Sequence, residues 1–383
     1  MARAIWLTYF DALPDPRVQR TRRHKLSDIL LMVLVGAIRD CRGWDEMRDS
    51  VEDGPPELRA LFELPHGVPC ADTLRRVIGA LDPVAFRNAF IAWARALCKS
   101  TAGKLVSIDG KTVRGAFAGE DGTGALHLVN AWVSENAMVL GQYATDVKSN
   151  EITAIPELIK LLDLRGAVVS IDAMGCQKNI ANAIRDAGAD YVFGLKGNHP
   201  TLHREVLDSF DDATCAKLAE SAHTFDAAAD KGHGRNEYRR VWVQRDVDWL
   251  VRSDQWSGLK TLVLVESERT IKGHTSRERR AYISSLDAPA ARMAALVRGH
   301  WHVENKLHWV LDVTFGEDRT KIAKKNGAEN LSLVRKSALN MLQNAPARGK
   351  RNSIAAKKKV ALWRFDYLLV VLGAGAFCDE KRV

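Results

Sequence analysis

Two stretches of the sequence are nearly identical and decide the fold: Leu105–Asp109 reads LVSID, and Val168–Asp172 reads VVSID. Each is a short apolar run typical of a buried strand, and each ends in an aspartate where a loop begins. If the strands are parallel neighbours, both carboxylates emerge at one edge of the sheet, where open α/β sheets bind ligands. Either aspartate alone would be interpreted as a helix cap or a surface acid, but the matched pair favours a site.

The chemistry of that pair indicates a cation. Two carboxylates held close together repel each other, so they either share a proton or bind a positive ion. Oxygen ligands with no cysteine beside them suit a hard ion such as Mg²⁺ or Mn²⁺. The sequence therefore predicts a metal site that includes Asp109 and Asp172.

A third acid is expected from the segment 298–315, which reads RGHWHVENKLHWVLDVTF. Four polar residues recur there at four-residue steps, which places them along one face of a helix: His300, Glu304, His308 and Asp312. A zinc site formed by the two histidines and Glu304 is an alternative, but the spacing departs from the HEXXH pattern. A solvated polar stripe beside packed tryptophans is a second alternative that the pattern leaves open.

The segments around the two motifs predict a mixed sheet with helices on its faces. The order is strand, hairpin, helix, strand, helix, strand. The expected strands are Lys104–Ile108, Leu126–Val133, Met138–Thr145, Ala167–Ile171 and Tyr191–Leu195, and the expected helices are Glu151–Leu162 and Gln177–Asp186.

The remaining sequence divides into three further parts. Residues 1–100 are expected to form a helical domain, and the region at about 198–288 a mainly β insertion. Residues 346–383 are expected to be a flexible basic tail. Six positive charges and no acid lie between Ala345 and Trp363: Arg348, Lys350, Arg351, Lys357, Lys358 and Lys359.

Composition narrows the class of protein. The chain has 383 residues, of which 46% are hydrophobic and 27% charged, values that exclude a disordered or collagen-like chain. Six scattered cysteines without a CxxC pair argue against a zinc ribbon or a disulfide scaffold and for a reducing cytoplasm. The N-terminus lacks a signal peptide, and no apolar run reaches the roughly 20 residues of a membrane span. We expect a soluble cytoplasmic protein, and the net charge of +9 favours a polyanionic partner.

Beyond these patterns, the chain resembles the DDE transposases of bacterial insertion sequences, in the H-repeat-associated branch. The resemblance extends from about Asp15 to Met341. The matching segments are DPR with HKLSDIL, GVPCADTLRRV, SIDGKTVRGA, HLVNAWV, KSNEITAIPELI, SIDAMGCQKNIA, DYVFGLKGNH, GHGRNE and RGHWHVENKLHWVLDVTFGED with ENLSLVRKSALNML. The family implies an RNase H-like catalytic core with a β insertion over residues 101–345 and an associated N-terminal helical, DNA-binding domain over residues 1–100.

The resemblance also implies residue roles. The three catalytic, metal-binding acids fall on Asp109, Asp172 and Glu304, with 62 residues between the two aspartates. A Tyr, Arg, Glu and Lys signature that many relatives carry is absent, since His300 and Leu311 stand where its first and last members would be. Basic and amide side chains near the motifs are candidates for contacts to DNA: Lys111, Arg114, Lys196, Asn198, Arg235, Arg298 and Lys306.

The function implied is Mg²⁺-dependent cleavage and joining of double-stranded DNA, at element ends and at a target, by a homo-oligomer. One alternative is a nuclease that has the same core but does not join strands. Another is a domesticated DNA-binding protein without catalysis, which the presence of Asp109, Asp172 and Glu304 disfavours.

Overall fold

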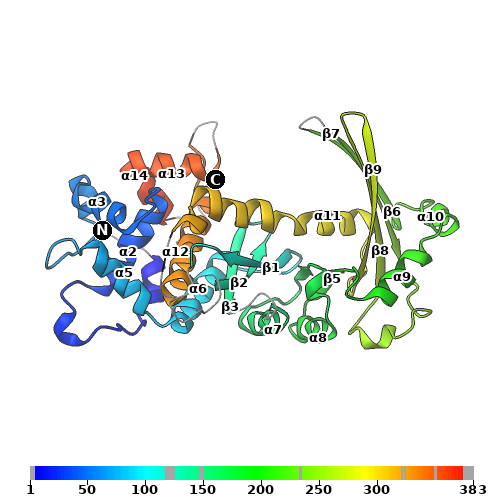
Figure 1. Ribbon diagram of the computed structural model, residues 1–383, viewed down its shortest axis with the longest axis horizontal. Coiled ribbons are helices and arrows are strands. Elements are labelled where there is room, and N and C mark those ends of the chain that lie inside the picture. Colours follow the sequence, from blue (N-terminus) through cyan, green and yellow to red (C-terminus); the bar gives the residue numbers. More distant parts are fainter. Residues whose placement is uncertain are drawn as a thin grey trace.

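The computed structural model describes residues 5–116, 126–145, 151–232, 235–320, 322, 325–348 and 352–373. Within these residues a nine-stranded sheet has the order β3-β2-β1-β4-β5-β9-β8-β7-β6, with helices packed around its first five strands (Figure 1). Those five strands are β1 (Leu105–Val113), β2 (Leu126–Val133), β3 (Met138–Thr145), β4 (Val168–Ile171) and β5 (Asp190–Gly194).

The expected mixed sheet is confirmed. Strands β1, β4 and β5 are parallel, whereas β2 pairs antiparallel with β1 and β3 pairs antiparallel with β2. Because side chains alternate along a strand, the two faces of the sheet bury different apolar sets. Val106 and Val169 pack in the cluster with helices α7 (Glu151–Leu161) and α8 (Lys178–Asp186), and Leu105 and Val168 pack in the cluster with helix α11 (Ala290–His300).

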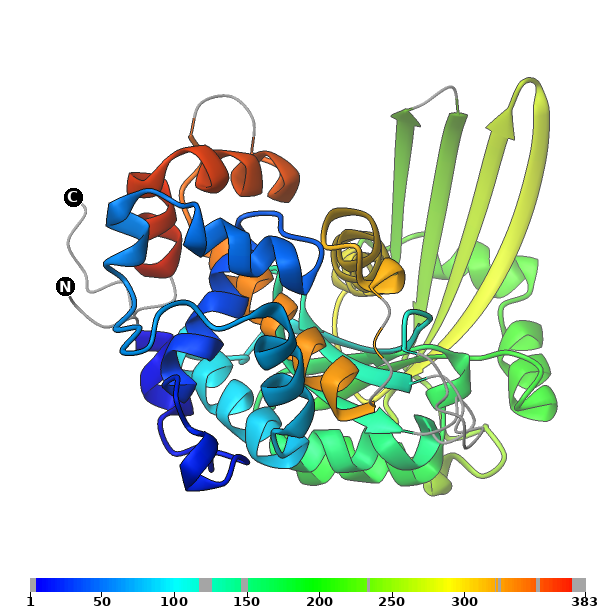
Figure 2. The same ribbon diagram turned by 60° about the vertical axis from the view of Figure 1, so that its left-hand side comes forward.

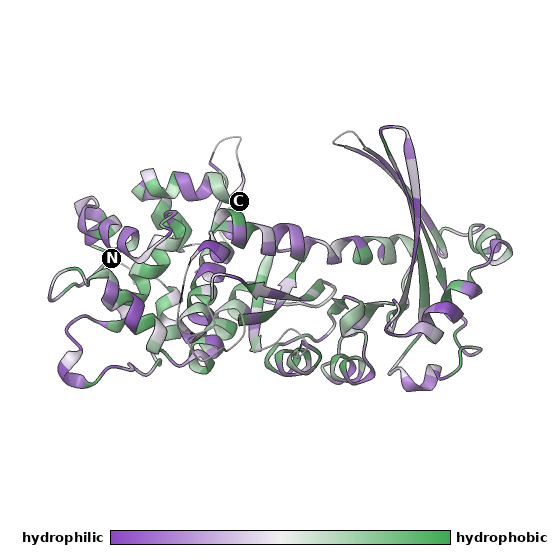
Figure 3. Ribbon diagram, in the orientation of Figure 1, coloured by the Kyte–Doolittle hydropathy of each residue, from purple (hydrophilic) through white to green (hydrophobic). Residues whose placement is uncertain are grey.

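The region 198–288, expected to be a mainly β insertion, contributes four strands that join the same sheet. Its strands are β6 (Phe225–Gly232), β7 (Arg235–Gln244), β8 (Thr261–Ile271) and β9 (His274–Ser284), and it begins with helices α9 (Pro200–Ser209) and α10 (Asp212–Leu218). Strand β9 pairs antiparallel with β5, so the insertion extends the core sheet. Figure 2 shows the paired strands projecting from the rest of the chain, and Figure 3 shows their far ends as largely hydrophilic. Those ends lack the alternating pattern that reveals a half-buried strand.

The first hundred residues are helical, as predicted. Among the described residues they form α1 (Ile5–Phe10), α2 (Leu26–Ile38), α3 (Trp44–Glu52), α4 (Pro56–Arg59), α5 (Ala71–Ala80) and α6 (Pro83–Cys98). Helix α6 begins at a cap that the sequence announces, because the Asp82 carboxylate accepts from the backbone N–H groups of Val84 and Ala85 and a proline follows it.

The expectation of a flexible basic tail is wrong for residues 354–373. They form α13 (Ile354–Trp363) and α14 (Phe365–Gly373), which share one apolar core with the N-terminal helices and with α12 (Lys325–Asn344). Two lysines of the supposed tail are buried. Lys357 Nζ donates to the carbonyls of Leu342 and Ala345, and Lys358 Nζ lies 3.0 Å from Asp40 Oδ1. A run of charged residues usually indicates a solvated segment, but here the ammonium groups of these two lysines bind carbonyl and carboxylate oxygens inside the fold.

No helix among the described residues is long and apolar enough to cross a bilayer.

Candidate functional site

The two motif aspartates follow paired positions of neighbouring strands. Strands β1 and β4 run in parallel with Ser107 opposite Ser170 and Ile108 opposite Ile171. Asp109 and Asp172 are therefore the next residues along each strand, on the face that α11 covers. Strand β4 ends there, and the Asp172 carboxylate caps the following turn by accepting from the N–H groups of Met174 and Gly175. Both cap bonds use Oδ1, so Oδ2 is left for another ligand.

Asp109 is the most perturbed acid at this edge. Its side chain is 18% exposed. Burial raises the pKa of Asp109 to about 7, and the charges of Asp172 and Glu304 are the next largest causes. The structure thus brings Glu304 within electrostatic range of Asp109, although it comes from a segment more than a hundred residues further along the chain.

Glu304 lies in an unusual helix. Helix α11 is followed by two π-helical segments, Val303–His308 and Val310–Thr314. The N–H of Trp309 bonds to the carbonyl of Glu304, five residues back, as a π-helix requires. Such segments occur frequently at functional sites. The sequence predicted a helix but not its wider winding, and the Glu304 side chain is exposed.

The other members of the polar stripe face the strands. His300 Nδ1 lies 3.0 Å from Ser170 Oγ, and that hydroxyl donates to Ser107 Oγ over 3.1 Å. His308 Nδ1 lies 3.5 Å from Asp109 Oδ2. Burial first, and then the charges of Lys111 and Lys336, lower the pKa of His308 to about 3. This imidazole is therefore neutral and leaves the charge on Asp109 uncompensated.

A metal site is not preformed. Among the described residues, no three His, Cys, Asp or Glu side chains lie close enough to hold one metal ion. The zinc alternative through His300, Glu304 and His308 accordingly lacks support. The three acids fit a hard cation in kind, because their donors are oxygens and their mutual repulsion would be relieved by positive charge. Asp109, Asp172 and Glu304 are the residues that would hold it.

Lys111, a predicted DNA contact, is a buried structural residue instead. It is 7% exposed. Its ammonium lies 2.5 Å from Asp312 Oδ1, 3.5 Å from Glu317 Oε2 and 3.5 Å from Asp318 Oδ1. An ammonium enclosed by three carboxylates cannot reach a phosphate, so we withdraw this contact. These acids lie some 200 residues away in the sequence, which is why Lys111 looked like a solvated loop residue.

The loop after β5 supports the turn that follows Asp172. Asn198 Nδ2 donates to the carbonyl of Ala173 over 2.6 Å, and His199 Nε2 lies 2.6 Å from the carbonyl oxygen of Cys176. Asn198 therefore supports this turn with one of its two amide N–H groups. Its side chain is exposed, so its contact with DNA stays a prediction.

The remaining candidate DNA contacts are mostly exposed. The side chains of Arg114, Lys196, Arg298 and Lys306 face solvent, and Arg298 also pairs with Asp230 at 2.5 Å. The Arg235 side chain lies outside the described residues. The exposed members stay predictions.

Sequence reasoning missed a buried pair beside Asp109. His127 on β2 bonds through Nε2 to the Glu151 carboxylate, and its Nδ1 lies 3.0 Å from Thr112 Oγ1. A Cβ on Gly110 would stand only 2.2 Å from Glu151 Oε1. Gly110 is thus required by the His127–Glu151 pair. A glycine directly after Asp109 was the feature of the sequence that could have indicated a crowded neighbour at this position.

Glu317, the nearest rival for the third acid, is turned away as predicted. Gly316 ends the helix in the left-handed conformation, with φ of 63°. Glu317 is 1% exposed and accepts a hydrogen bond from Ser332 Oγ. Burial alone would raise the pKa of Glu317, but Lys111, Lys336 and Arg335 lower it below its ordinary value. Glu317 is therefore a structural countercharge.

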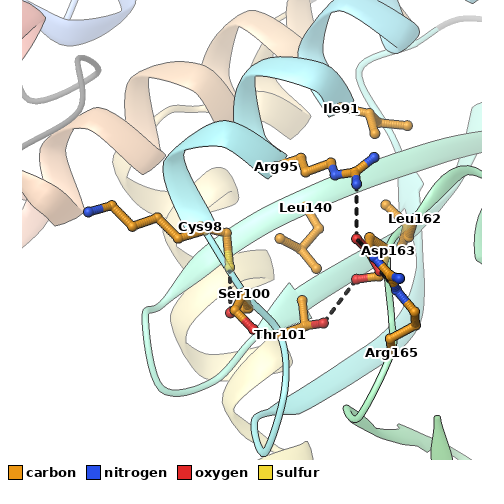
Figure 4. Close-up of a pocket in the computed structure, with 10 residues that line it drawn as sticks. Ile91, Arg95, Cys98, Ser100, Thr101, Leu140, Leu162, Asp163 and Arg165 are labelled. Atoms are coloured by element: carbon orange, nitrogen blue, oxygen red, sulfur yellow. Dashed lines mark hydrogen bonds and ion pairs between the residues drawn. The ribbon is translucent and has the colours of Figure 1, made fainter. Parts of the chain in front are cut away.

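A separate cavity of about 390 Å³ lies away from these acids (Figure 4). Its lining includes Arg95, Thr101, Asp163 and Arg165, and both arginines pair with Asp163. Thr101 precedes β1, so the cavity is at the amino end of the strand that carries Asp109. Ligands of open α/β sheets bind at the opposite end, so this cavity is not the active-site candidate.

Comparison with known proteins shows the family to which the chain belongs. The family described as "Transposase DDE domain" matches residues 101–341. This chain belongs to the DDE transposase family. A second family, described as "DDE_Tnp_1-associated", matches residues 7–94. Membership of the DDE transposase family confirms the resemblance found in the sequence.

Two relatives of this DDE transposase family member are similar over nearly the whole chain. The "H repeat-associated putative transposase YhhI" of Escherichia coli K12 is 39% identical over 375 residues, covering 96% of this chain and 98% of that protein. The "Putative transposase YncI" of Escherichia coli O157:H7 is 38% identical over 378 residues, covering 98% and 95%. Among solved structures, a piggyBac transposase synaptic complex with hairpin DNA is 12% identical with a TM-score of 0.44, covering 96% of this chain and 76% of that one.

Proposed function

We propose that the chain is an active transposase that cleaves DNA at the ends of an insertion sequence and joins those ends to a target. The observation that carries the proposal is the electrostatic coupling of Asp109 to Asp172 and Glu304 at the carboxyl ends of two parallel strands. The strand order β3-β2-β1-β4-β5, with β1, β4 and β5 parallel, supports an RNase H-like core.

The three acids would act as metal ligands. Divalent cations held by them would activate a water or 3′-hydroxyl nucleophile and stabilise the leaving oxygen of a phosphodiester. Asp109 has acidic neighbours on two sides, so it is the residue expected to serve both ions, with Asp172 and Glu304 each completing one side. No protein nucleophile is needed, because a water or a 3′-hydroxyl would attack the phosphodiester.

Double-stranded DNA is the proposed substrate, both as element end and as target, with a homo-oligomer acting on it. Exposed basic side chains near the acids, Arg114, Lys196, Arg298 and Lys306, are proposed to contact phosphates. Such contacts give affinity that is independent of sequence and falls with salt. A chromosomal substrate would place the protein in the bacterial cytoplasm.

The test uses a plasmid that carries the insertion sequence encoding this chain. With Mg²⁺ the full chain should nick or excise at the element ends, and pre-cut ends with a free 3′-hydroxyl should be joined to a second plasmid. Cleavage without joining would indicate the nuclease alternative. Binding without either reaction would indicate the non-catalytic alternative and overturn the proposal.

A further inference from the structure

We propose that Lys111 and Asp312 form a positioning pair that holds the Glu304 carboxylate in register with Asp109. The inference rests on the proposed function and deepens it, because it assigns a role to residues that do not themselves bind metal or DNA. Asp312 lies in the π-helical segment that continues from Glu304, and Lys111 lies two residues after Asp109 on β1.

The strand and the helix meet at matched points. Side chains at alternate positions of β1 share a face, so Ser107, Asp109 and Lys111 all point toward α11 and its π-helical extension. Ser107 connects through Ser170 to His300, Asp109 lies beside His308, and Lys111 pairs with Asp312. Along the chain, Glu304 lies after His300, which makes the first of these contacts, and before His308 and Asp312, which make the other two. Its position is thus set by contacts on both sides.

Apolar packing alone would not fix this register. Val303, Leu307 and Leu311 bury the other face of the segment, but apolar contacts have no directionality and tolerate small slides and rotations. The Lys111–Asp312 ion pair, in which the lysine is buried and the aspartate half-buried, is directional. Fixing a register is the best-attested use of ionic groups inside a fold. Gly299 brings the helix close to the strand at the other end, since a Cβ there would stand 2.5 Å from Leu105 Cδ2.

Lys111 is itself held in place. Glu317 and Asp318 contact it from the turn that follows the π-helix, and neither belongs to the segment that carries Glu304. Removing the Asp312 charge therefore leaves Lys111 with two countercharges but releases the helix. This asymmetry supplies a matched pair of variants, Asp312→Asn and Asp318→Asn. Both remove one carboxylate from Lys111, and only the first lies on the helix of Glu304.

The experiment compares the two variants in the full chain. Four quantities are measured: the dissociation constant for Mn²⁺ by electron paramagnetic resonance, the kcat and the KM for DNA cleavage, and the Tm. Loss of a group that orients metal ligands typically costs about 10–100-fold in metal affinity or activity. We expect Asp312→Asn to weaken Mn²⁺ binding and lower kcat within that range while KM stays near wild type. Asp318→Asn should change both quantities less than about threefold, well below that range. Asp312→Glu, which restores the charge, should recover part of the loss.

Equal effects of Asp312→Asn and Asp318→Asn on Mn²⁺ affinity and kcat would overturn the positioning role and leave the proposed function standing. So would a loss in Asp312→Asn that follows Tm alone and that Asp312→Glu does not recover. A wild-type chain that neither binds Mn²⁺ nor cleaves would overturn the proposed function and the positioning role together.

Discussion

Ser170 donates a hydrogen bond from its hydroxyl to that of Ser107 over 3.1 Å, and the two serines are partners in the β1–β4 register. Each stands two residues before its aspartate in the repeated VSID motif. The repeat is thus not merely compositional, because its two copies lie side by side. His300 lies within hydrogen-bond distance of the Ser170 hydroxyl. This contact connects the helix that leads to Glu304 with Ser170 and, through Ser170, with Ser107.

The raised pKa of Asp109 predicts how stability depends on pH. Its pKa is about 7 in the fold, against an ordinary value of 3.8, so the folded state binds the proton more tightly than the unfolded state. The contribution of this group to stability is fully present below about pH 4 and is lost as pH rises through 7. Between pH 5 and 8, metal-free wild type should therefore lose stability relative to Asp109→Asn, by about 1 kcal/mol or more. Urea unfolding of both proteins at each pH measures this, and parallel curves would contradict it.

Addition of Mg²⁺ should reverse that loss. A cation among the acids favours the ionised form of Asp109, so at pH 8 it should stabilise wild type and leave Asp109→Asn nearly unchanged. Thermal unfolding of both proteins, without Mg²⁺ and at Mg²⁺ concentrations raised in tenfold steps, gives the comparison. An equal Tm shift in both proteins would show that the ion binds elsewhere.

Glu304→Gln and Glu317→Gln should fail in different ways. Glu304 is exposed, so its amide variant should fold normally and lose cleavage by several orders of magnitude. Glu317 is buried among Lys111, Lys336 and Arg335, and breaking such a network costs about 3–5 kcal/mol. Its variant should therefore unfold at lower temperature while the folded fraction still cleaves. Intact cleavage in Glu304→Gln would refute the placement of the third acid.

Truncation after residue 352 should act on stability before it acts on DNA. It would remove α13 and α14, and with them core residues such as Ala361 and Leu368, and so expose the apolar side chains of the shared helical core that these helices cover. It would also remove Lys357 from the end of α12. We expect a lower Tm and less soluble protein. A truncated chain with wild-type Tm and weakened binding to all duplexes would instead support a DNA-binding tail.

Binding of duplex DNA should show the signature of phosphate contacts. Lys306 is exposed beside Glu304, and Lys306→Gln should reduce the slope of log affinity against log salt by about 1 without changing sequence preference. Lys111→Met is the contrasting variant, because a buried ammonium contributes no counterion release. Filter binding over a salt series measures both slopes, and equal reductions would contradict our assignment of Lys111.

The sequence predicted what is local and periodic. The apolar runs that end in Asp109 and Asp172 fix two adjacent strands, and the four-residue steps of His300, Glu304 and His308 place one face of a helix against them. It did not predict long-range charge pairing. Lys111, Lys357 and Lys358 look solvated in the sequence, because the groups that neutralise or accept from them lie elsewhere in the chain.

The π winding and the distant pairing of His127 with Glu151 were also beyond the sequence. Over so short a segment, helical periodicity does not distinguish hydrogen bonds that span five residues from those that span four. Glu151 is 24 residues from His127, so no local pattern reveals their pairing. The far ends of β8 and β9 are exposed, so they lack the alternation that marks a buried strand.

The central claim is that Asp109, Asp172 and Glu304 hold divalent cations together. Anomalous scattering from a crystal of the full chain grown with Mn²⁺ tests it most directly, because the ion is located without reference to activity. We predict Mn²⁺ with carboxylate oxygens of Asp109 and at least one of the other two acids at about 2.0–2.2 Å, and every acid engaged once DNA is bound. Mn²⁺ bound elsewhere, or a DNA complex in which Glu304 stays clear of every ion, would contradict the account.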